Sequence, residues 1–284
     1  MIKADLHVHS NCSDGSDSIS ELIENIKKSD INIFSLTDHD TIEGVQEIEK
    51  SIPTNVTFIK GVELTCQTEF FKCHILGFGY NPDDKGLNEL IKLGKELRRI
   101  KLEKRIDYLQ DVWNIDLTQE ELDWLYSRKS VVKTHFANIL VNRKLADDNV
   151  SAMKKYLDAC KTGNTKFDAK EAVNVLINAG AIPIWAHPLG GEGEVHLTKD
   201  EFKHRLEYMK NIGIQGFECF YSRYNQEEEQ FLKQCAEENN MLISGGSDYH
   251  GTNKLNIQLG KLNTNNSPIN TYELTVLNKL EIKQ

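Results

Sequence analysis

MLISGGSDYHG, residues 241–251, begins as an apolar run and ends in two titratable side chains, Asp248 and His250. Alternate residues of an extended chain point to the same face, so these two side chains share one face at the end of a strand. The glycines before them allow the backbone to approach a ligand closely. A plain surface turn gives no reason for two large polar groups here. The stretch therefore predicts a strand that ends in a binding site.

The same arrangement, an apolar run that ends in histidines or carboxylates, recurs along the chain. The residues in this position are His7, His9, Asp14, His39, Glu63, His74, His187, Asp248 and His250. Taken singly, His74 and His187 are better explained as buried structural histidines, and the string around His39 also fits a polar loop with a helix cap. Taken together, six imidazoles and three carboxylates at strand ends have no good structural explanation without cations to balance them.

The ligand types indicate which ions such a site takes. Imidazole and carboxylate without thiolate suit Mn²⁺, Fe or Zn²⁺. The six cysteines contain no CxxC pair and are expected to be reduced, mostly buried thiols. Nine candidate ligands exceed the three or four that one ion needs, so we expect two or three divalent ions per chain, with Mn²⁺ favoured and Fe or Zn²⁺ as alternatives. Such ions activate water and stabilise the oxygens of a reacting phosphoryl group.

Strand and helix patterns alternate on both sides of a long helical block. Strands are expected at 2–6, 33–36 and 56–64, a hairpin or a strand pair at 66–78, and a strand at 181–188 in which Pro183 favours an edge or a bulge. Repeated βα units predict an α/β fold with a parallel sheet, closed or open. Residues 85–167 have helix patterns throughout. We therefore expect a barrel or sheet domain from residues 1–84 and 168–284, and a helical insertion, or cap, at 85–167.

Composition excludes several classes of protein. The net charge of −9 argues against a broad basic face that wraps duplex nucleic acid. Bound cations can still reverse the local charge of a site, so a phosphorylated substrate remains compatible with this total. No apolar run approaches the roughly 20 residues that cross a bilayer, and MIKADLHVHS lacks the layout of a signal peptide. We expect a cytoplasmic protein.

The motifs, in order, resemble those of the PHP (polymerase and histidinol phosphatase) family over nearly the whole chain. They are HVHSNCSDGS (7–16), TDHDT (37–41), GVEL (61–64), HILGFG (74–79), AHP (186–188) and GGSDYHG (245–251). The resemblance implies a distorted seven-stranded (β/α)7 TIM-like barrel with three metal ions. One ion takes His7, His9, Glu63 and Asp248; a second shares Glu63 with His74 and His187; the third takes Asp14, His39 and His250. Asp14 stands where some members have another histidine.

Within the family, the helical block and THFANILV (134–141) resemble a branch of nucleoside 3′,5′-bisphosphate phosphatases and 5′→3′ exoribonucleases. That branch has an arginine where this chain has Lys133, which keeps the charge and loses the bidentate fork. Arg98, Arg99 and Arg105 resemble its phosphate-binding helix, although a solvated helix face explains them equally well. The candidate substrate-binding residues are Arg98, Arg99, Lys133 and His135. The candidate catalytic residues are His135, Asp38 and Asp40. Glu218, in GFECFYS, also fits the branch, either behind the metal ligands or against a base.

The resemblance implies hydrolysis of phosphate monoesters on small nucleotides, such as nucleoside 3′,5′-bisphosphates and short RNA read 5′ to 3′, by a metal-activated hydroxide. In this view His135 holds the phosphate that is not cleaved and protonates the leaving oxygen. The expected partner is a small phosphorylated molecule, with no membrane and no duplex nucleic acid. Two alternatives stay open: a histidinol-phosphate or sugar-phosphate phosphatase on the same metal centre, and a non-catalytic accessory barrel.

Overall fold

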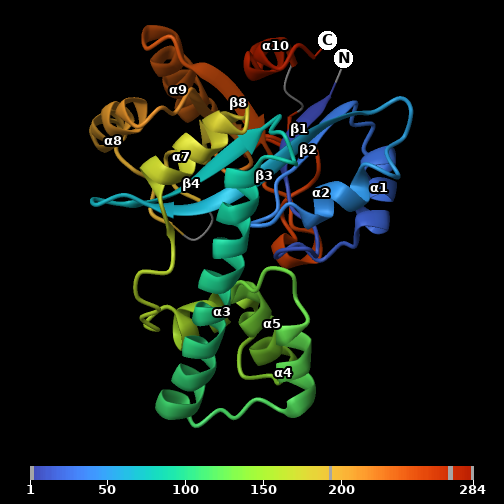
Figure 1. The fold of residues 1–284 in the computed structure, drawn as a ribbon, viewed down its shortest axis with the longest axis vertical. Helices are drawn as coiled ribbons and strands as arrows, with labels where there is room; N and C mark the ends of the chain where they lie inside the picture. The colour runs from blue at the N-terminus through green and yellow to red at the C-terminus, as the bar shows by residue number, and fades with distance from the viewer. Residues whose placement is uncertain (1–2, 192–193, 268–270, 283–284) are drawn as a thin grey trace.

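The computed structural model describes residues 3–191, 194–267 and 271–282 (Figure 1). Its strands are β1 (Ala4–Val8), β2 (Ile33–Leu36), β3 (Thr57–Gln67), β4 (Lys72–Phe78), β5 (Phe167–Asp168), β6 (Ile182–Trp185), β7 (Gly216–Tyr221) and β8 (Leu242–Gly246). Seven strands follow one another in the order β1-β2-β3-β4-β6-β7-β8, and β5 pairs with β3 off this path. Most of their residues are buried, as expected of strands covered on both faces.

Backbone hydrogen bonds between the two ends of this order nearly close the sheet into a barrel. The amide of Asp248 donates to the carbonyl of His7 at 2.8 Å, and the amide of His9 donates to the carbonyl of Tyr249 at 2.9 Å. Neighbouring strands run parallel, except that β4 runs antiparallel to both β3 and β6. The predicted fold class, an α/β protein with a distorted seven-stranded barrel, is confirmed.

Helices that follow the strands cover the outside of the barrel. α1 (Ile19–Lys28) and α2 (Glu43–Ile48) lie on one side, and α7 (Ala169–Asn178), α8 (Lys199–Asn211) and α9 (Gln226–Glu238) lie on the other (Figure 1). α1 begins at the predicted capping box, in which Ser18 and Glu21 each satisfy a backbone amide of the other. Its four apolar residues, which recur at helical spacing, are all buried against the sheet as expected: Ile19, Leu22, Ile23 and Ile26.

The block between β4 and β5 is helical, and most of it lies to one side of the barrel. It contains α3 (Lys85–Trp113), α4 (Gln119–Tyr126), α5 (Lys133–Asn142), α6 (Asn149–Ala152) and a π-helical turn, η1 (Met153–Leu157). Figure 1 shows α3 running from the barrel to the far end of the molecule, with α4 and α5 beside it. These helices pack around a hydrophobic cluster of their own, which includes Leu109, Leu125 and Phe136. The block is called the helical insert below.

Three details differ from the sequence-based expectation. β3 continues past Glu63 to Gln67, because it pairs with β4 along its second half. His74 lies near the start of β4 rather than at a strand end, and it still reaches the barrel mouth because β4 runs antiparallel. The edge or bulge expected at Pro183 is wrong, since β6 pairs with β4 on one side and with β7 on the other without a register shift. The Pro183 carbonyl accepts from the amide of Gln215.

The C-terminal residues, which sequence patterns leave unassigned, contain two 3₁₀ turns, η2 (Gly251–Lys254) and η3 (Thr271–Glu273), and a short helix, α10 (Val276–Lys279). Leu274, Val276 and Leu277 from this segment are buried in the main hydrophobic core. Among the described residues, no helix combines the length and the apolar character that crossing a bilayer requires.

Candidate metal centre

The nine predicted ligands gather at one end of the barrel, where the parallel strands end. Glu63 lies at the centre of the group: it is 1% exposed, and its two carboxylate oxygens face different histidines. β3 supplies Glu63, β1 supplies His7, and the loops after β1, β2, β6 and β8 supply most of the others. This is the edge at which parallel α/β barrels place their active sites.

Four ligand atoms form a compact cage on one side of Glu63. The two imidazole Nε2 atoms of His7 and His9 lie 3.1 Å apart, and each lies 3.2–3.5 Å from Glu63 Oε2 and from Asp248 Oδ1. Bonds of about 2.0–2.2 Å to a tetrahedral ion imply ligand-to-ligand separations of about 3.3–3.6 Å. The observed spacings therefore fit four donors around one cation.

The other oxygen of Glu63 faces a second pair of histidines. Glu63 Oε1 lies 2.9 Å from His74 Nδ1 and 3.3 Å from His187 Nε2. Glu63 Oε2 also lies 3.0 Å from His39 Nδ1. The Nδ1 atoms of His39 and His74 and the Oε2 atom of Glu63 are buried without a hydrogen-bond partner of proper geometry. Buried polar atoms that lie close together without forming hydrogen bonds have the arrangement expected of metal ligands, whose lone pairs point at a shared cation.

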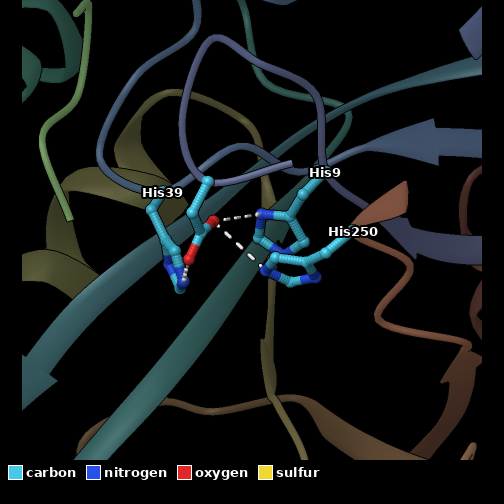
Figure 2. A group of neighbouring side chains, drawn as sticks. His9, His39 and His250 are labelled. Atoms are coloured by element: carbon cyan, nitrogen blue, oxygen red, sulfur yellow. Dashed lines mark ion pairs between the residues drawn. The ribbon is translucent and has the colours of Figure 1, made fainter. Parts of the chain in front are cut away.

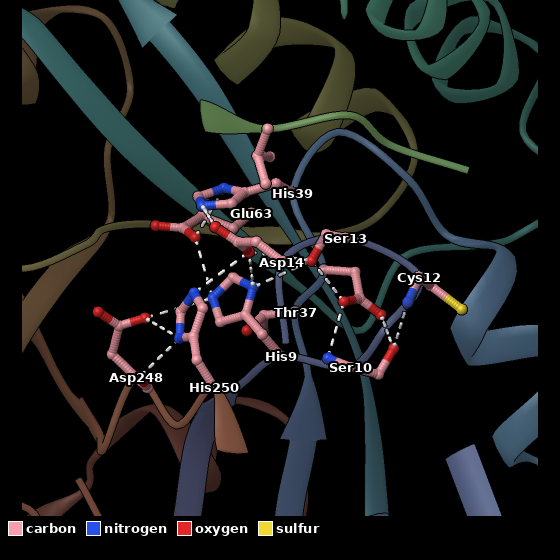
Figure 3. Close-up of polar contacts among 12 residues, drawn as sticks. His9, Ser10, Cys12, Ser13, Asp14, Thr37, His39, Glu63, Asp248 and His250 are labelled. Atoms are coloured by element: carbon pink, nitrogen blue, oxygen red, sulfur yellow. Dashed lines mark hydrogen bonds and ion pairs between the residues drawn. The ribbon is translucent and has the colours of Figure 1, made fainter. Parts of the chain in front are cut away.

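Asp14 gathers a third set of histidines (Figure 2). Its Oδ1 lies 3.1 Å from His250 Nε2 and 3.6 Å from His9 Nδ1, and its Oδ2 lies 3.7 Å from His39 Nε2. His9 and His39 thus face both Asp14 and Glu63, which makes the three ligand sets parts of one connected cluster (Figure 3). This sharing was not expected from the sequence, which assigned each of these histidines to a single ion.

The buried carboxylates and histidines of the cluster strongly shift one another's pKa values. Burial opposes the charged form of His9, but contacts with Asp248, Glu63 and Asp14 outweigh it and raise the pKa of His9 to about 9. Burial also opposes ionisation of Glu63, while His39, His7 and His74 hold its pKa well below the usual value. Burial lowers the pKa of His39 to about 4 despite its carboxylate neighbours. Divalent cations, when bound, would balance these buried carboxylates.

Backbone geometry at the mouth explains the glycines of GGSDYHG. A Cβ atom on Gly246 would lie 2.2 Å from the Cβ of His7, so the glycine lets β8 approach β1 rather than a ligand. Asp248 has φ 59° and His187 has φ 29°, both in the left-handed region that L-residues seldom adopt. Such conformations cluster at functional sites, where surrounding contacts hold them in place.

Buried partners hold several of the candidate ligands from behind. Glu218, which is fully buried, places one oxygen 3.0 Å from His7 Nδ1 and accepts from the amide of His187 at 2.7 Å. Tyr221 donates its hydroxyl to Asp248 at 2.9 Å. A carboxylate on the outer nitrogen of a histidine fixes the ring tautomer and leaves Nε2 available to a metal.

Asp38 lies behind the cluster rather than in the open site. Its carboxylate accepts from the amide and the hydroxyl of Ser10 at 2.9 and 2.6 Å, and from the hydroxyl of Ser13 at 2.6 Å. Burial raises the pKa of Asp38, although His9 and these hydrogen bonds oppose the shift. Asp38 therefore organises the Ser10–Asp14 loop, whose polar contacts appear in Figure 3.

Asp40 and the arginines of α3 are likewise not gathered around the open site. Arg98 donates its Nε to Asp40 at 2.7 Å and its Nη2 to the Thr65 hydroxyl at 2.8 Å, and both members of this ion pair are buried. Arg99 is exposed and pairs with Glu103 one turn along the helix. Arg98 thus joins α3 to the barrel, and Arg99 lies on the solvated face that the sequence left as an alternative.

His135 is buried at the start of α5, where its Nδ1 accepts from the amide of Val132 at 3.2 Å. Burial lowers its pKa to about 4, against the opposing effect of Asp14, so the ring is neutral near pH 7. Trp124 packs edge-on against it, with ring centroids 5.3 Å apart. His135 therefore lies between Trp124 of the insert and the Ser13–Asp14 segment of the barrel, next to the third set of candidate ligands.

A cavity of about 690 Å³ lies over the cluster and extends to the helical insert. Its barrel wall includes Asp14, Glu63, His74, His187, Asp248 and His250. Its opposite wall includes Lys133, the single predicted substrate-binding residue that lines it, together with Thr134 and Lys154. Lys254, from η2, also lines the cavity and donates to Asp248 at 2.6 Å. Sequence patterns missed Lys154 and Lys254, because isolated lysines carry no periodic signal; only the closeness of Lys254 to His250 hinted at it.

Comparison with known proteins identifies the family. A 5′-3′ exoribonuclease of Haemophilus influenzae is 29% identical over 252 residues, which cover 87% of this chain and 90% of that protein. A 3′,5′-nucleoside bisphosphate phosphatase of Chromobacterium violaceum is 25% identical, with 88% of each chain covered. A solved structure, that of a proposed metal-dependent phosphoesterase from Bifidobacterium adolescentis, superposes with a TM-score of 0.79 over 92% of each chain at 22% identity, and so shares the fold.

The family model of the PHP domain matches residues 5–170, more than half of the chain. This range carries Asp14 and Glu63, on which the three ligand sets of the cluster centre. The remaining ligands, from the loops after β6 and β8, complete the same cluster. The chain therefore belongs to the PHP domain family, as its motifs indicated, and is a hydrolase acting on phosphoric ester bonds, with buried histidine and carboxylate clusters that fit divalent metal ions.

Proposed function

We propose that this hydrolase removes a phosphate from small nucleotides that carry a second phosphate, nucleoside 3′,5′-bisphosphates in the first place, and that it also accepts short 5′-phosphorylated RNA. One observation carries the proposal. The cavity of about 690 Å³ has the metal ligands on one wall and lysines of the helical insert on the other. Its size lies within the usual range for one organic ligand, about 300–1,000 Å³. The names of the two curated relatives support the same substrate class.

The donor set fits two or three divalent ions, and we propose Mn²⁺ as the preferred one. His7, His9, Glu63 and Asp248 hold the first ion; Glu63, His74 and His187 hold the second; Asp14, His39 and His250 hold the third. The oxygen and imidazole donors without thiolate suit Mn²⁺, with Fe and Zn²⁺ as alternatives. When bound, such ions supply an activated water and neutralise the phosphoryl oxygens.

The chain's own side chains orient the substrate between the two walls. Residues 85–167 serve as a cap, in which Lys133 and Lys154 face the phosphate that is not cleaved. Lys133 is held in place by Asp158, and Lys254 is held against Asp248. Held cations lose less conformational freedom when a phosphate arrives, so they improve orientation as well as affinity. His135, neutral and packed, positions α5 and with it Lys133.

One alternative is a sugar-phosphate or histidinol-phosphate phosphatase, which needs the metal wall and gains nothing from a second phosphate near Lys133. It therefore predicts no advantage for a bisphosphate over its monophosphate. The non-catalytic accessory barrel is set aside, because the chain belongs to a hydrolase family.

A phosphate-release assay with added Mn²⁺ tests the proposal. The panel pairs each nucleoside 3′,5′-bisphosphate with the matching nucleoside monophosphates and adds histidinol phosphate and sugar phosphates. We expect kcat/KM to be highest for a bisphosphate, activity to vanish with a chelator, and Lys133→Met to reduce kcat/KM mainly through KM. Equal rates for mono- and bisphosphates, or preference for a sugar phosphate, would reject the nucleotide assignment. Elemental analysis that finds at most one ion per chain after Mn²⁺ loading would reject the proposed metal count.

A further inference from the structure

A second cavity, of about 740 Å³, opens beside the metal centre and shares His74, His187 and Glu194 with the first. It lies between the β3–β4 hairpin, from Thr65 to His74, and the loop after β6, and none of the residues that line it comes from α5 or α6. The two cavities therefore meet at the metal ligands. A molecule held by its phosphate at the centre can extend into either one.

Three cations line this second cavity, which is called the hairpin groove below: Lys72, Lys166 and Arg205. Within the described part of the chain, none of the three lies at ion-pair distance from a carboxylate. Two of the three lysines at the other cavity differ, because Lys133 and Lys254 are each paired with an aspartate. Burial, together with nearby Lys72, lowers the pKa of Lys166, as expected where positive charge is not neutralised. Glu69 and Glu194 also line the groove, and Glu194 accepts from the amide of Gly191.

Aromatic side chains accompany these cations. The guanidinium carbon of Arg205 lies over the ring of Phe71, 4.7 Å from its centroid. Phe71 lies 6.2 Å from Trp185, and the ring of Phe70, at the tip of the hairpin, is 71% exposed. A guanidinium over an aromatic ring can still bind a phosphate through its N–H groups or stack on a base. Cations interleaved with aromatic rings are the usual composition of a groove for single-stranded nucleic acid.

We infer that the hairpin groove binds the nucleotides of a single-stranded oligonucleotide whose reacting phosphate lies at the metal centre. Lys72, Lys166 and Arg205 take its backbone phosphates, and Phe71, Phe70 and Trp185 provide the apolar surface for a base. The inference rests on the proposed function and adds to it the place where the remaining nucleotides of the substrate bind. A mononucleotide bisphosphate fills the first cavity alone, so the groove matters only to longer substrates. Its volume suits a nucleotide unit rather than a duplex.

The test uses Arg205→Met, which keeps the apolar stem over Phe71 and removes the charge. Lys203→Met is the matched control, because Lys203 lies on the same helix, α8, and faces Phe231 instead of the groove. Both variants and the wild type are assayed with Mn²⁺ on a nucleoside 3′,5′-bisphosphate and on a 5′-phosphorylated RNA trinucleotide with the same first nucleoside. We expect Arg205→Met to raise KM for the trinucleotide by about five- to tenfold, the usual effect of one such contact. KM for the bisphosphate stays within twofold, and Lys203→Met changes neither. Arg205→Lys should recover part of the loss.

A binding measurement separates this inference from the proposed function. A fluorescent, 5′-phosphorylated trinucleotide is titrated with each protein in the presence of a chelator, so that no cleavage occurs, and its anisotropy is followed. Weaker binding by Arg205→Met than by Lys203→Met supports the groove even if no nucleotide is cleaved. The absence of cleavage would reject the proposed function but not the groove. Bisphosphate cleavage with equal trinucleotide binding by all three proteins would overturn the groove and leave the function standing. An equal loss on both substrates, or a lowered melting temperature that accounts for it, would also overturn the groove.

Discussion

The barrel mouth and the helical insert both carry clustered charge, and they use it in opposite ways. At the mouth, Glu63 and Asp14 face more histidines than they can bind by hydrogen bonds. In the insert, the two best-placed cations are already neutralised, Arg98 by Asp40 and Lys133 by Asp158. Unbalanced charge thus marks the place that takes ions, whereas the balanced pair of Arg98 and Asp40 joins the insert to the barrel and that of Lys133 and Asp158 orders the insert itself.

This difference shows which charged motifs indicate a ligand-binding site. Converging polar groups that are buried and lack hydrogen-bond geometry demand a ligand, because leaving them unsatisfied costs several kcal/mol each. A basic run on a helix makes no such demand, since solvent or a nearby carboxylate satisfies it. The sequence grouped Arg98, Arg99 and Lys133 as substrate-binding residues. Of these three, only Lys133 lines the cavity, whereas Arg98 pairs with Asp40 and Arg99 with Glu103.

The largest expected effect comes from breaking the mouth at its centre. Glu63→Gln removes the charge that the two oxygens share among five histidines, so adjacent cations are left to repel each other. We expect turnover to fall by about 10³-fold, equivalent to about 4 kcal/mol, and the metal content to fall by more than one ion per chain. Glu89→Gln, on the exposed face of α3, is the control and should change neither. Normal turnover with full metal content in Glu63→Gln would show that this carboxylate bridges nothing.

The insert is broken most directly at Arg98. Arg98→Met removes the guanidinium that balances the buried Asp40 carboxylate, which keeps only the amide of Thr65 as a hydrogen-bond donor. Breaking a buried pair of this kind costs about 3–5 kcal/mol of stability. Arg99→Met, one residue away and exposed, should cost less than about 0.5 kcal/mol. Urea denaturation of both variants, followed by far-UV circular dichroism, gives the comparison. If the two variants were equally stable and Arg98→Met lost bisphosphate affinity instead, the arginine would be a substrate ligand and the contrast between mouth and insert would fail.

The barrel could be predicted from sequence for a physical reason. Buried strands must be apolar, helices must carry an apolar stripe, and parallel strands bring their ends to one edge, so the Ser18 capping box and the strand-end histidines were informative at short range. Prediction failed where the answer depends on long-range pairing. The hairpin offered for 66–78 is confirmed, but the interior position of Pro183 and the extension of β3 to Gln67 follow from the pairing of whole strands, which short sequence patterns do not show.

The same limit applies to the site. His7, His9, Glu63 and Asp248 were found because two-residue spacing and strand ends are local patterns, and the structure brings them within 3.5 Å of one another. Lys154 and Lys254 have no local pattern, and only the approach of η1 and η2 to the mouth gives them a place in the cavity. Asp38 and Asp40 were grouped with the catalytic residues because they flank His39, although each side chain points to a structural partner.

A smaller effect is expected behind the mouth, at Glu218. Its carboxylate contacts His7 Nδ1 and the amide of His187, so Glu218→Gln keeps the shape and removes the charge that fixes the His7 ring. Such partners contribute about 10–100-fold to metal affinity or activity. We expect the Mn²⁺ concentration for half-maximal activity to rise by that factor while kcat at saturating Mn²⁺ changes little. A loss of kcat that excess Mn²⁺ does not restore would place Glu218 in contact with the substrate instead.

The smallest expected effect concerns a buried lysine of α3 and sharpens the comparison. Lys101 is 5% exposed, faces Arg98, Asp40, Arg105 and Lys166, and has a pKa that burial lowers to about 7. Because its usual pKa is 10.5, the unfolded chain binds more protons between these two values, so the contribution of Lys101 to stability rises as the pH rises from about 7 towards 10.5. Lys101→Met should therefore raise the melting temperature most at pH 6.5, with an advantage that shrinks by pH 9.5. Lys92→Met, exposed on the same helix, should show no such trend. A pH-independent difference, or a loss of stability, would contradict the assignment.

Groups that reduce stability are commonly retained for function, so kcat/KM for a bisphosphate should be measured alongside. If Lys101→Met is more stable and also loses kcat/KM, the insert contains a buried, unbalanced charge that serves the reaction, as the charges at the mouth do. If it does not, every cation that joins the insert to the barrel serves the fold.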